Sequence, residues 1–462
     1  MIVMKFGGSS VGDGPRIVNV AGIVKDTKKP KIVVVSALGG VTDKLVNIAT
    51  KVVDLPTLVV EKEVDLFYRD ILIQHREALE DAVPDRRVLS ELLPKIIELL
   101  DQLRIGLLGV GYLEDLSPRS MDYITSFGER LSVLIVEGAL RSMGVNAVSL
   151  TGHEAGMITD SNFGSARPIH SKSRAKAKRV LIPLLKAGKT PVVTGFVSGN
   201  ENAKITTLGR GGSDYTASLL GNYLSSKEVQ IWTDVEGIMT TDPRIVREAK
   251  PIETLSYVEA MDLAYFGAKV IHSKMIEPAM VAGIPVWVKN SFKPESKGTL
   301  IVRDQKRIKS VIKSVTIKND VALLTVQGVG MAETPNIAGR IFSILGGNSI
   351  NIPMISGSSE SNLSFIVNQG DLEKAVDLIK NEIEDDGFRG VNIKENVSVI
   401  TVVGAGMAGT KGIAAKVFST ISKANVNIIM IAQGSSEVNI SFVVKDSDSK
   451  KAVKALHKRF IK

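Results

Sequence analysis

The stretch MIVMKFGGSSVG (1–12) begins the first domain of the chain and indicates its fold. A short apolar run ending at Phe6 predicts a buried strand, and the two glycines and two serines that follow predict a tight turn. The sequence contains no G-x-x-x-x-G-K-[ST] segment, which excludes a P-loop. Whether this turn holds a phosphate therefore depends on the other glycine-rich segments of the chain.

Further strand-like runs recur up to about residue 300, and they are continuous rather than alternating: KIVVVSA (31–37), TPVVTGFV (190–197), EVQIWTDV (228–235) and IPVWVKN (284–290). Continuous apolar runs suit strands that are buried on both faces, and helical patterns separate them. This order predicts an α/β domain, with a largely parallel open sheet and helices on both of its faces. The charged helical stretch around 55–105 predicts an inserted helical layer.

Four glycine-rich segments follow predicted strands in this domain. They supply Lys5, Gly7, Gly8 and Ser9; Ser36, Gly39, Gly40 and Thr42; Thr194 and Gly195; and Thr206, Thr207, Gly209, Arg210, Gly211, Gly212, Ser213 and Asp214. Ligands of open parallel sheets bind at the carboxyl ends of the strands, where glycines let backbone N–H groups approach phosphate oxygens. Taken singly, each of these segments is better explained by a tight turn between strand and helix. Four together, with a lysine, an arginine and an aspartate among them, favour a phosphate site on successive strands.

Three other segments of this domain supply further polar side chains. SFGERLS (126–132) places Glu129 at the entry to a long helix, where the alternative is a first-turn acid stabilised only by the helix dipole. WTDVEGIMTTDPRIV (232–246) follows a strand and offers groups for a ribose and a base. FGAKVIHSK (266–274) supplies Lys269, which either reaches a phosphate or lies on the surface.

Composition excludes several classes of protein. Among 462 residues, 44% are hydrophobic and none is cysteine, so disulfides and thiolate metal sites are excluded. No apolar run reaches the roughly 18 residues of a membrane span, and no signal peptide is evident, so we expect a cytoplasmic protein without a membrane partner. The net charge of +9 allows a nucleic acid or small anions as partners, and the scattered basic residues with only 5% aromatics favour small anions over nucleic acid.

The C-terminal part contains an internal repeat. After the polar stretch near residue 290, the segment 328–367 recurs as 404–444, with Gly330 matching Gly406 and Phe342 matching Phe418. Each copy predicts strand, glycine turn, helix, strand, turn, strand and helix, which implies two small α/β sandwiches of ferredoxin-like type. Residues 308–318, which contain the run IKSVTIK, predict one additional strand. This strand either completes one of the two sheets or serves as a linker.

The second copy also contains a G-x-G-x-x-G segment, at Gly404, Gly406 and Gly409. The first copy breaks this pattern with Glu333, and no acidic residue lies about 20 residues further on, as a dinucleotide site requires. We therefore expect these glycines to serve a tight turn from strand to helix.

Taken together, these segments resemble the aspartokinases, members of the amino-acid kinase family with two C-terminal ACT domains. The resemblance covers essentially the whole chain, and its carriers are KFGGSSV, VVSALGGVTDKL, SFGERLS, TLGRGGSDYTA, WTDVEGIMTTDPR, FGAKVIH and the paired repeats. It implies ATP-dependent phosphorylation of the β-carboxylate of L-aspartate to 4-phospho-L-aspartate, on the pathway to lysine, threonine and methionine. It divides the chain into a catalytic domain (1–300), a linker with a strand (301–320), a first ACT domain (321–395) and a second (396–462), and implies a monofunctional enzyme.

The resemblance also implies roles for single residues. Lys5 and Asp214 are catalytic, and Ser36, Thr42, Glu129 and Arg210 bind aspartate, with Glu129 on its ammonium and Arg210 on its α-carboxylate. Mg-ATP is the second substrate, with Mg²⁺ held mainly by the ATP oxygens and no protein metal site. The implied nucleotide-binding residues are Gly7, Gly8, Ser9, Gly211, Gly212, Ser213, Thr233, Asp234, Arg244 and Lys269. Met239 stands where many relatives have a tyrosine near the adenine, and a methionine still offers apolar contact to a base.

ACT domains resemble amino-acid sensors, so feedback by an amino acid is implied, with threonine favoured over lysine, in a homodimer or larger assembly formed through these domains. The implied effector residues are Gly330, Met331, Ala332, Asn348 and Asn351. Two alternatives remain from the sequence. One is another amino-acid kinase, such as a glutamate or acetylglutamate kinase. The other is a non-catalytic amino-acid-sensing protein, which would be expected to have lost Lys5 or Asp214.

Overall fold

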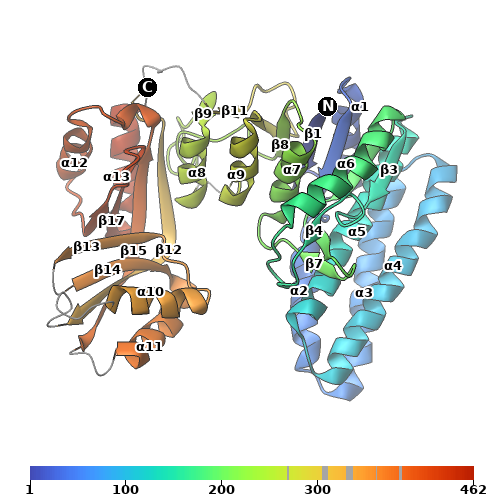
Figure 1. Ribbon diagram of the computed structural model, residues 1–462, viewed down its shortest axis with the longest axis horizontal. Coiled ribbons are helices and arrows are strands. Elements are labelled where there is room, and N and C mark those ends of the chain that lie inside the picture. The colour runs from blue at the N-terminus through green and yellow to red at the C-terminus, as the bar shows by residue number, and fades with distance from the viewer. Residues whose placement is uncertain (268–269, 304–310, 329–336, 360–361, 384–387, 462) are drawn as a thin grey trace. The chain divides into compact units, whose positions relative to one another are not determined.

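The computed structural model describes residues 1–267, 270–303, 311–328, 337–359, 362–383 and 388–461 (Figure 1). The chain divides into two compact units. The first contains Met1–Ile238, Glu253–Tyr257 and Val270–Arg303, and the second contains Met239–Ile252, Val258–Lys269 and Asp304–Lys462.

The first unit is built on an eight-stranded sheet in the order β3-β5-β2-β1-β8-β10-β11-β9. Its strands are β1 (Ile2–Phe6), β2 (Lys31–Val35), β3 (Ala147–Leu150), β5 (Thr190–Thr194), β8 (Val229–Thr233), β9 (Thr254–Ser256), β10 (Val286–Asn290) and β11 (Thr299–Val302). Every neighbouring pair is parallel except β10 and β11. The predicted α/β fold with a largely parallel sheet is therefore confirmed.

Alternate residues of β1 explain how helices cover both faces of this sheet. Ile2, Met4 and Phe6 are fully buried and join a core with residues of α1 (Gly14–Asp26), α2 (Val41–Val53) and α5 (Pro118–Ser142). Lys5 points to the other face, where its partner lies on α7 (Gly212–Tyr223). The helices α6 (His170–Lys186) and α9 (Ser273–Ala282) complete this unit.

The predicted helical layer consists of two long helices, α3 (Thr57–Ala82) and α4 (Arg86–Leu113), which run side by side next to α5 (Figure 1). Buried aliphatic residues of both helices, such as Val64 and Leu100, extend the core of the sheet into this layer. The layer is therefore part of the main core rather than an appendage.

The position of Glu129 in α5 differs from the prediction. The helix begins at Pro118, after Ser117 caps it by accepting the Ser120 N–H at 3.1 Å. Glu129 is thus in the middle of a 25-residue helix, and not at its entry. A first-turn acid stabilised by the helix dipole is consequently no explanation for this residue.

The glycine-rich segment after Thr207 also differs from the prediction, because it does not follow a strand of the main sheet. It follows β7 (Ile205–Thr207), which belongs to a separate three-stranded sheet with β4 (Ile158–Thr159) and β6 (Val197–Asn200). The other three segments do follow the adjacent strands β1, β2 and β5 of the main sheet.

The second unit contains a six-stranded sheet in the order β13-β14-β12-β15-β17-β16. Its strands are β12 (Ser314–Gly328), β13 (Met354–Ser359), β14 (Asn362–Asn368), β15 (Phe388–Val403), β16 (Met430–Ala432) and β17 (Asn439–Lys445). The helices α10 (Ile337–Gly347) and α11 (Leu372–Ile383) share a core with the first repeat, and α12 (Ile413–Lys423) and α13 (Asp446–Phe460) share one with the second.

The two repeats share this one sheet instead of forming two separate sandwiches. The second half of β12 pairs with β14 of the first repeat, whereas its first half, Ser314–Lys318, pairs with Val399–Val403 of β15. The other side of this part of β15 pairs with β17. Residues 314–318 thus supply a fourth strand to the second repeat, because β12 and β15 are long enough to serve both.

Helix α8 (Tyr257–Tyr265) lies in the chain before Phe266, and residues 258–267 belong to the second unit. Phe266 is buried in a cluster with residues of β12, β15 and β17, including Val321 and Val399. Within the described part of the chain, no helix is both long and apolar enough to span a membrane.

Candidate active site

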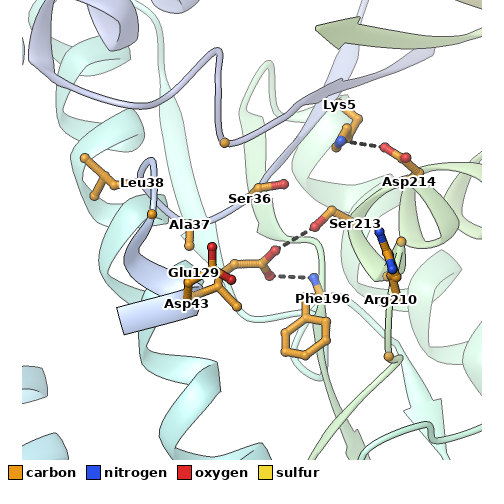
Figure 2. Close-up of a pocket in the computed structure, with 16 residues that line it drawn as sticks. Lys5, Ser36, Ala37, Leu38, Asp43, Glu129, Phe196, Arg210, Ser213 and Asp214 are labelled. Atoms are coloured by element: carbon orange, nitrogen blue, oxygen red, sulfur yellow. Dashed lines mark hydrogen bonds and ion pairs between the residues drawn. The ribbon is translucent and has the colours of Figure 1, made fainter. Parts of the chain in front are cut away.

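A cavity of about 380 Å³ lies in the first unit, next to the carboxyl ends of β1 and β2 (Figure 2). It is lined by Lys5, Gly8, Ser36, Ala37, Leu38, Gly40, Thr42, Asp43, Glu129, Phe196, Gly209, Arg210, Gly211, Gly212, Ser213 and Asp214. Residues from all four regions that were predicted separately thus surround one space. Ten of these lining residues are among the site residues expected from the sequence.

Lys5 and Asp214 form an ion pair at the edge of the cavity. The Lys5 Nζ lies 2.5 Å from the Asp214 Oδ1, and both side chains are only 12% exposed (Figure 2). Lys5 belongs to β1 and Asp214 to the first turn of α7, so the pair joins strand and helix. Asp214 holds the ammonium group at the cavity wall, where it can meet an anion.

The turn after β1 brings backbone close to this ammonium group. A Cβ atom at Gly7 would lie 3.4 Å from the Lys5 Nζ, and one at Gly8 would lie 3.3 Å from the Ala37 carbonyl oxygen. A side chain at Gly8 would press on the turn after β2, whereas one at Gly7 would only make ordinary contact with the lysine. Gly8 lines the cavity and leaves the main chain uncovered beside a cation, which is the arrangement that phosphate oxygens require.

Glu129 is the most deeply buried acidic group of the cavity, with the residue 3% exposed. One carboxylate oxygen accepts the Phe196 N–H at 2.5 Å, and the other accepts the Ser213 hydroxyl at 2.7 Å (Figure 2). The first oxygen also accepts the Val197 N–H at 3.3 Å. Burial raises the pKa of Glu129 to about 7, against the opposing effects of these hydrogen bonds and of the Lys5 charge. A cationic group in the cavity would favour its ionised form.

The segment that carries Arg210 depends on glycine at two positions. Gly209 and Gly211 have φ angles of 73° and 76°, in the left-handed region that glycine enters most easily. A Cβ atom at Gly211 would also lie 2.4 Å from the His272 ring, so a side chain would strike it. This backbone places Arg210 at the cavity and starts α7 at Gly212.

Asp122 anchors this segment and was missed by the sequence analysis. Its carboxylate accepts the Gly164 N–H at 3.0 Å, the Thr207 N–H at 3.0 Å and the Thr207 hydroxyl at 2.6 Å, and the residue is 1% exposed. Thr207 comes just before the turn of Gly209. The available signal was the spacing of Asp122 and Glu129, which places both on one face of α5.

The other six lining residues of the cavity were absent from the predicted site residues: Ala37, Leu38, Gly40, Asp43, Phe196 and Gly209. The first four of them belong to the quoted segment VVSALGGVTDKL. Gly7 and Ser9 do not line the cavity, but the Gly7 N–H donates to the Trp232 carbonyl oxygen at 3.3 Å. Ser9 contributes its carbonyl oxygen, which accepts from Arg16 at 3.2 Å.

The predicted ribose and base groups do not line this cavity. Thr233 ends β8, which neighbours β1, and its hydroxyl donates to the Asp234 carboxylate at 3.0 Å. Arg244 lies in the second unit with an 86% exposed side chain, 2.7 Å from the Asp242 carboxylate. Lys269 lies outside the described residues.

Of the predicted effector residues, Gly330, Met331 and Ala332 likewise lie outside the described residues. Asn348 follows α10 and donates to the Ile344 carbonyl oxygen at 3.0 Å, and Asn351 is exposed. Among the residues that the structure describes, no cluster of three or more histidine and carboxylate side chains is suited to a metal ion.

Comparison with known proteins places this geometry in context. A family model described as "Amino acid kinase family" matches residues 1–290, and one described as "ACT domain" matches residues 324–383 and 400–460. Aspartokinase 1 of Arabidopsis thaliana, a chloroplastic protein, is 33% identical over 99% of this chain and 80% of its own length. Aspartokinase 3 of the same plant, also chloroplastic, is 34% identical over 99% of this chain and 81% of its own.

Two solved structures cover the whole of this chain and are covered in full by it. Escherichia coli aspartokinase III in complex with aspartate and ADP has a TM-score of 0.85 at 30% identity. The same enzyme in complex with lysine and aspartate has a TM-score of 0.81 at 30% identity.

Proposed function

Since the chain belongs to the aspartokinases, within the amino acid kinase family, we propose that its cavity transfers the terminal phosphoryl group of ATP to L-aspartate. The product of this reaction is 4-phospho-L-aspartate, and the two ACT domains make the enzyme subject to feedback by an amino acid. The observation that carries the assignment of the site is the cavity itself, where Glu129 and the pair of Lys5 and Asp214 face one space.

The nucleophile of this reaction is the β-carboxylate of aspartate, which is ionised at neutral pH, so the site needs no general base. Catalysis then consists of aligning the two anions and neutralising the phosphoryl oxygens during transfer. Lys5 supplies the positive charge, and the amide of Gly8, which lines the cavity, adds a donor beside it. Gly7 and Ser9 are proposed to reach the phosphates too, although the Gly7 N–H donates to the Trp232 carbonyl oxygen in this structure. Asp214 fixes the direction of the lysine, as the ion pair in the cavity wall supports.

Recognition of aspartate uses groups of both signs. Glu129 binds the α-ammonium, which draws its carboxyl group into the ionised form, and Arg210 binds the α-carboxylate through its planar fork. Ser36 and Thr42 line the same cavity and bind the rest of the substrate. A buried acid whose pKa lies near 7 suits this role, because the arriving ammonium group replaces the water that burial removed.

The nucleotide enters as Mg-ATP. Its phosphates lie against Gly211, Gly212 and Ser213 at the start of α7, where the positive end of the helix dipole favours an anion. Thr233, Asp234, Arg244 and Lys269 are proposed for the ribose, base and phosphates. The magnesium ion is held mainly by the ATP oxygens, since Mg²⁺ commonly keeps few protein ligands at such sites.

The effector is proposed to bind at the glycine turn of the first ACT domain, with Asn348 and Asn351. Threonine is proposed ahead of lysine, and lysine is the alternative that the Escherichia coli relative supports, because one of its structures contains lysine. Assembly into a homodimer or larger through the ACT domains, in the cytoplasm, belongs to the same proposal.

An ADP-release assay at fixed Mg-ATP, run with aspartate, with glutamate and with no acceptor, tests the reaction. We expect turnover with aspartate alone, and hydroxylamine should trap the acyl phosphate. Turnover with glutamate would favour another amino-acid kinase. No turnover with either acceptor would favour a non-catalytic sensing protein. Threonine and lysine, titrated separately into the same assay, test the effector.

A further inference from the structure

The glycine turn of the second ACT domain begins where β15 ends. Gly404 follows Val403, and a short 3-10 helix, Ala405–Met407, leads on toward α12. A Cβ atom at Gly404 would lie 2.2 Å from the Val311 carbonyl oxygen, so the turn is held tightly against the segment before β12. In the repeat this turn corresponds to residues 328–331 of the first ACT domain.

A carboxylate from elsewhere in the chain occupies this turn. Glu259 of α8 is fully buried, and one of its oxygens accepts the Ala405 N–H at 2.7 Å. Its other oxygen lies 2.9 Å from the Lys313 Nζ, whose side chain is 6% exposed. The Lys313 backbone N–H in turn donates to the Val403 carbonyl oxygen at 2.8 Å, which fixes the lysine beside the turn.

Two other contacts keep this helix in register with the same domain. Asp262, one turn further along α8, accepts from the Asn439 side chain at 2.8 Å at the start of β17. Phe266 then enters the buried cluster on the sheet. Glu259 differs from these two residues because it contacts the turn itself.

The surroundings of Glu259 have the chemistry of a carboxylate-binding site. A turn N–H and a buried ammonium group each bind one oxygen, which is how protein backbones and cations capture carboxylates of ligands. A buried ion pair is weak evidence for stability, since well-packed apolar residues often serve as well, so its presence at a turn of a sensing domain calls for another explanation.

We propose that Glu259 is an internal ligand of the second ACT domain: its carboxylate fills a monocarboxylate site formed by Ala405 N–H and Lys313. While it is in place, this turn is closed to free amino acids, and helix α8 is fixed to the domain. The inference does not depend on the reaction that the first unit catalyses.

Chemical rescue tests this assignment on the full-length protein. Glu259→Ala removes the CH₂–COO⁻ end of the side chain, which acetate matches in size. We expect the variant to melt at a lower temperature than the wild type, and acetate to raise its melting temperature in a saturable manner, by about 3 °C, relative to chloride at equal ionic strength. Acetamide should give no such rise, and adding Lys313→Met should abolish the response to acetate.

Glu253→Ala is the matched control, because Glu253 is an exposed glutamate six residues earlier in the chain. If acetate raises the melting temperature of Glu259→Ala no more than that of the wild type and of this control, the turn is not a carboxylate site and the proposal is wrong.

A second pair of variants covers the case in which Glu259→Ala does not fold. Glu259→Gln keeps an acceptor for the Ala405 N–H but removes the negative charge beside Lys313. We expect Lys313→Met to raise the melting temperature in the Glu259→Gln background and to lower it in the wild type. A fall in both backgrounds would overturn the proposal.

Discussion

Replacing Glu129 by glutamine tests the proposed aspartate site most directly. The substitution keeps the shape of the side chain and an oxygen that can accept from Phe196 and Val197, but it removes the charge. Glutamine can also offer an N–H to the Ser213 hydroxyl, which can act as an acceptor. The variant therefore isolates the effect of the negative charge from the effect of packing.

The expected change in stability follows from the pKa of Glu129. Burial raises this pKa from 4.5 to about 7, which corresponds to about 3 kcal/mol of preference for the protonated form in the folded protein. That contribution to stability is fully present below pH 4.5 and is lost as the pH rises toward 7. Glutamine remains neutral throughout, so without ligands the variant should gain up to about 3 kcal/mol over the wild type between pH 5 and pH 8.

The expected change in activity has the opposite sign. Losing a buried charge that pairs with the substrate ammonium should reduce kcat/KM for aspartate by about 100-fold, with little change in KM for ATP. In the wild type kcat/KM for aspartate should rise with pH and level off above about 7, as Glu129 of the free enzyme ionises. The variant should lack this step in its pH profile.

Urea unfolding at pH 5 and pH 8, and initial rates over the same range, provide the measurements. Glu137→Gln is the control, since Glu137 lies on the same helix, pairs with Arg141 at 3.3 Å and does not line the cavity. Parallel stability curves for the wild type and Glu129→Gln, or a KM for aspartate within twofold of the wild type, would refute the reasoning.

Three further variants test separate parts of the structure. Lys5→Ala should abolish turnover while the circular dichroism spectrum is retained, and near-normal turnover in a folded variant would exclude the phosphoryl role of Lys5. Asp122→Asn should raise KM for aspartate by about 10-fold with less effect on kcat, because the segment before Arg210 loses its charged acceptor, and an effect on ATP alone would contradict this positioning. Leu100→Ala, in the helical layer, should lower the free energy of unfolding by about 2–5 kcal/mol and leave KM for both substrates unchanged, as urea unfolding and rates would show.

Much of the main sheet could be predicted from the sequence, because its strands carry local signals. β1, β2 and β5 are continuous apolar runs that end in glycine-rich turns, and a parallel sheet brings such ends to one edge. The cavity follows from this rule and not from any single motif.

Other features could not be predicted, because they depend on contacts between distant residues. Gly128 beside Glu129 suggests a helix boundary, but the structure uses it for close packing, since a Cβ atom there would lie 2.9 Å from the Ala37 Cβ. The acceptors that Asp122 provides serve Gly164 and Thr207, far along the chain, and no pattern in the sequence joins these positions. The pairing of β7 with β6, outside the main sheet, likewise depends on contacts that the local sequence does not specify.

The internal repeat shows why two similar segments need not form binding sites of the same kind. The repeat predicts two glycine turns of the same type, but the segment that contains Glu259 occurs once in the chain, so within one chain it can fill only one of them. In the described residues it fills the turn of the second ACT domain, through Ala405 and Lys313. If both turns keep an affinity for carboxylates, a free amino acid then competes with the protein itself at the second turn but not at the first. The internal ligand thus gives a physical reason for proposing the effector site in the first ACT domain, and a Glu259→Ala variant that binds a second amino acid per chain would be its direct consequence.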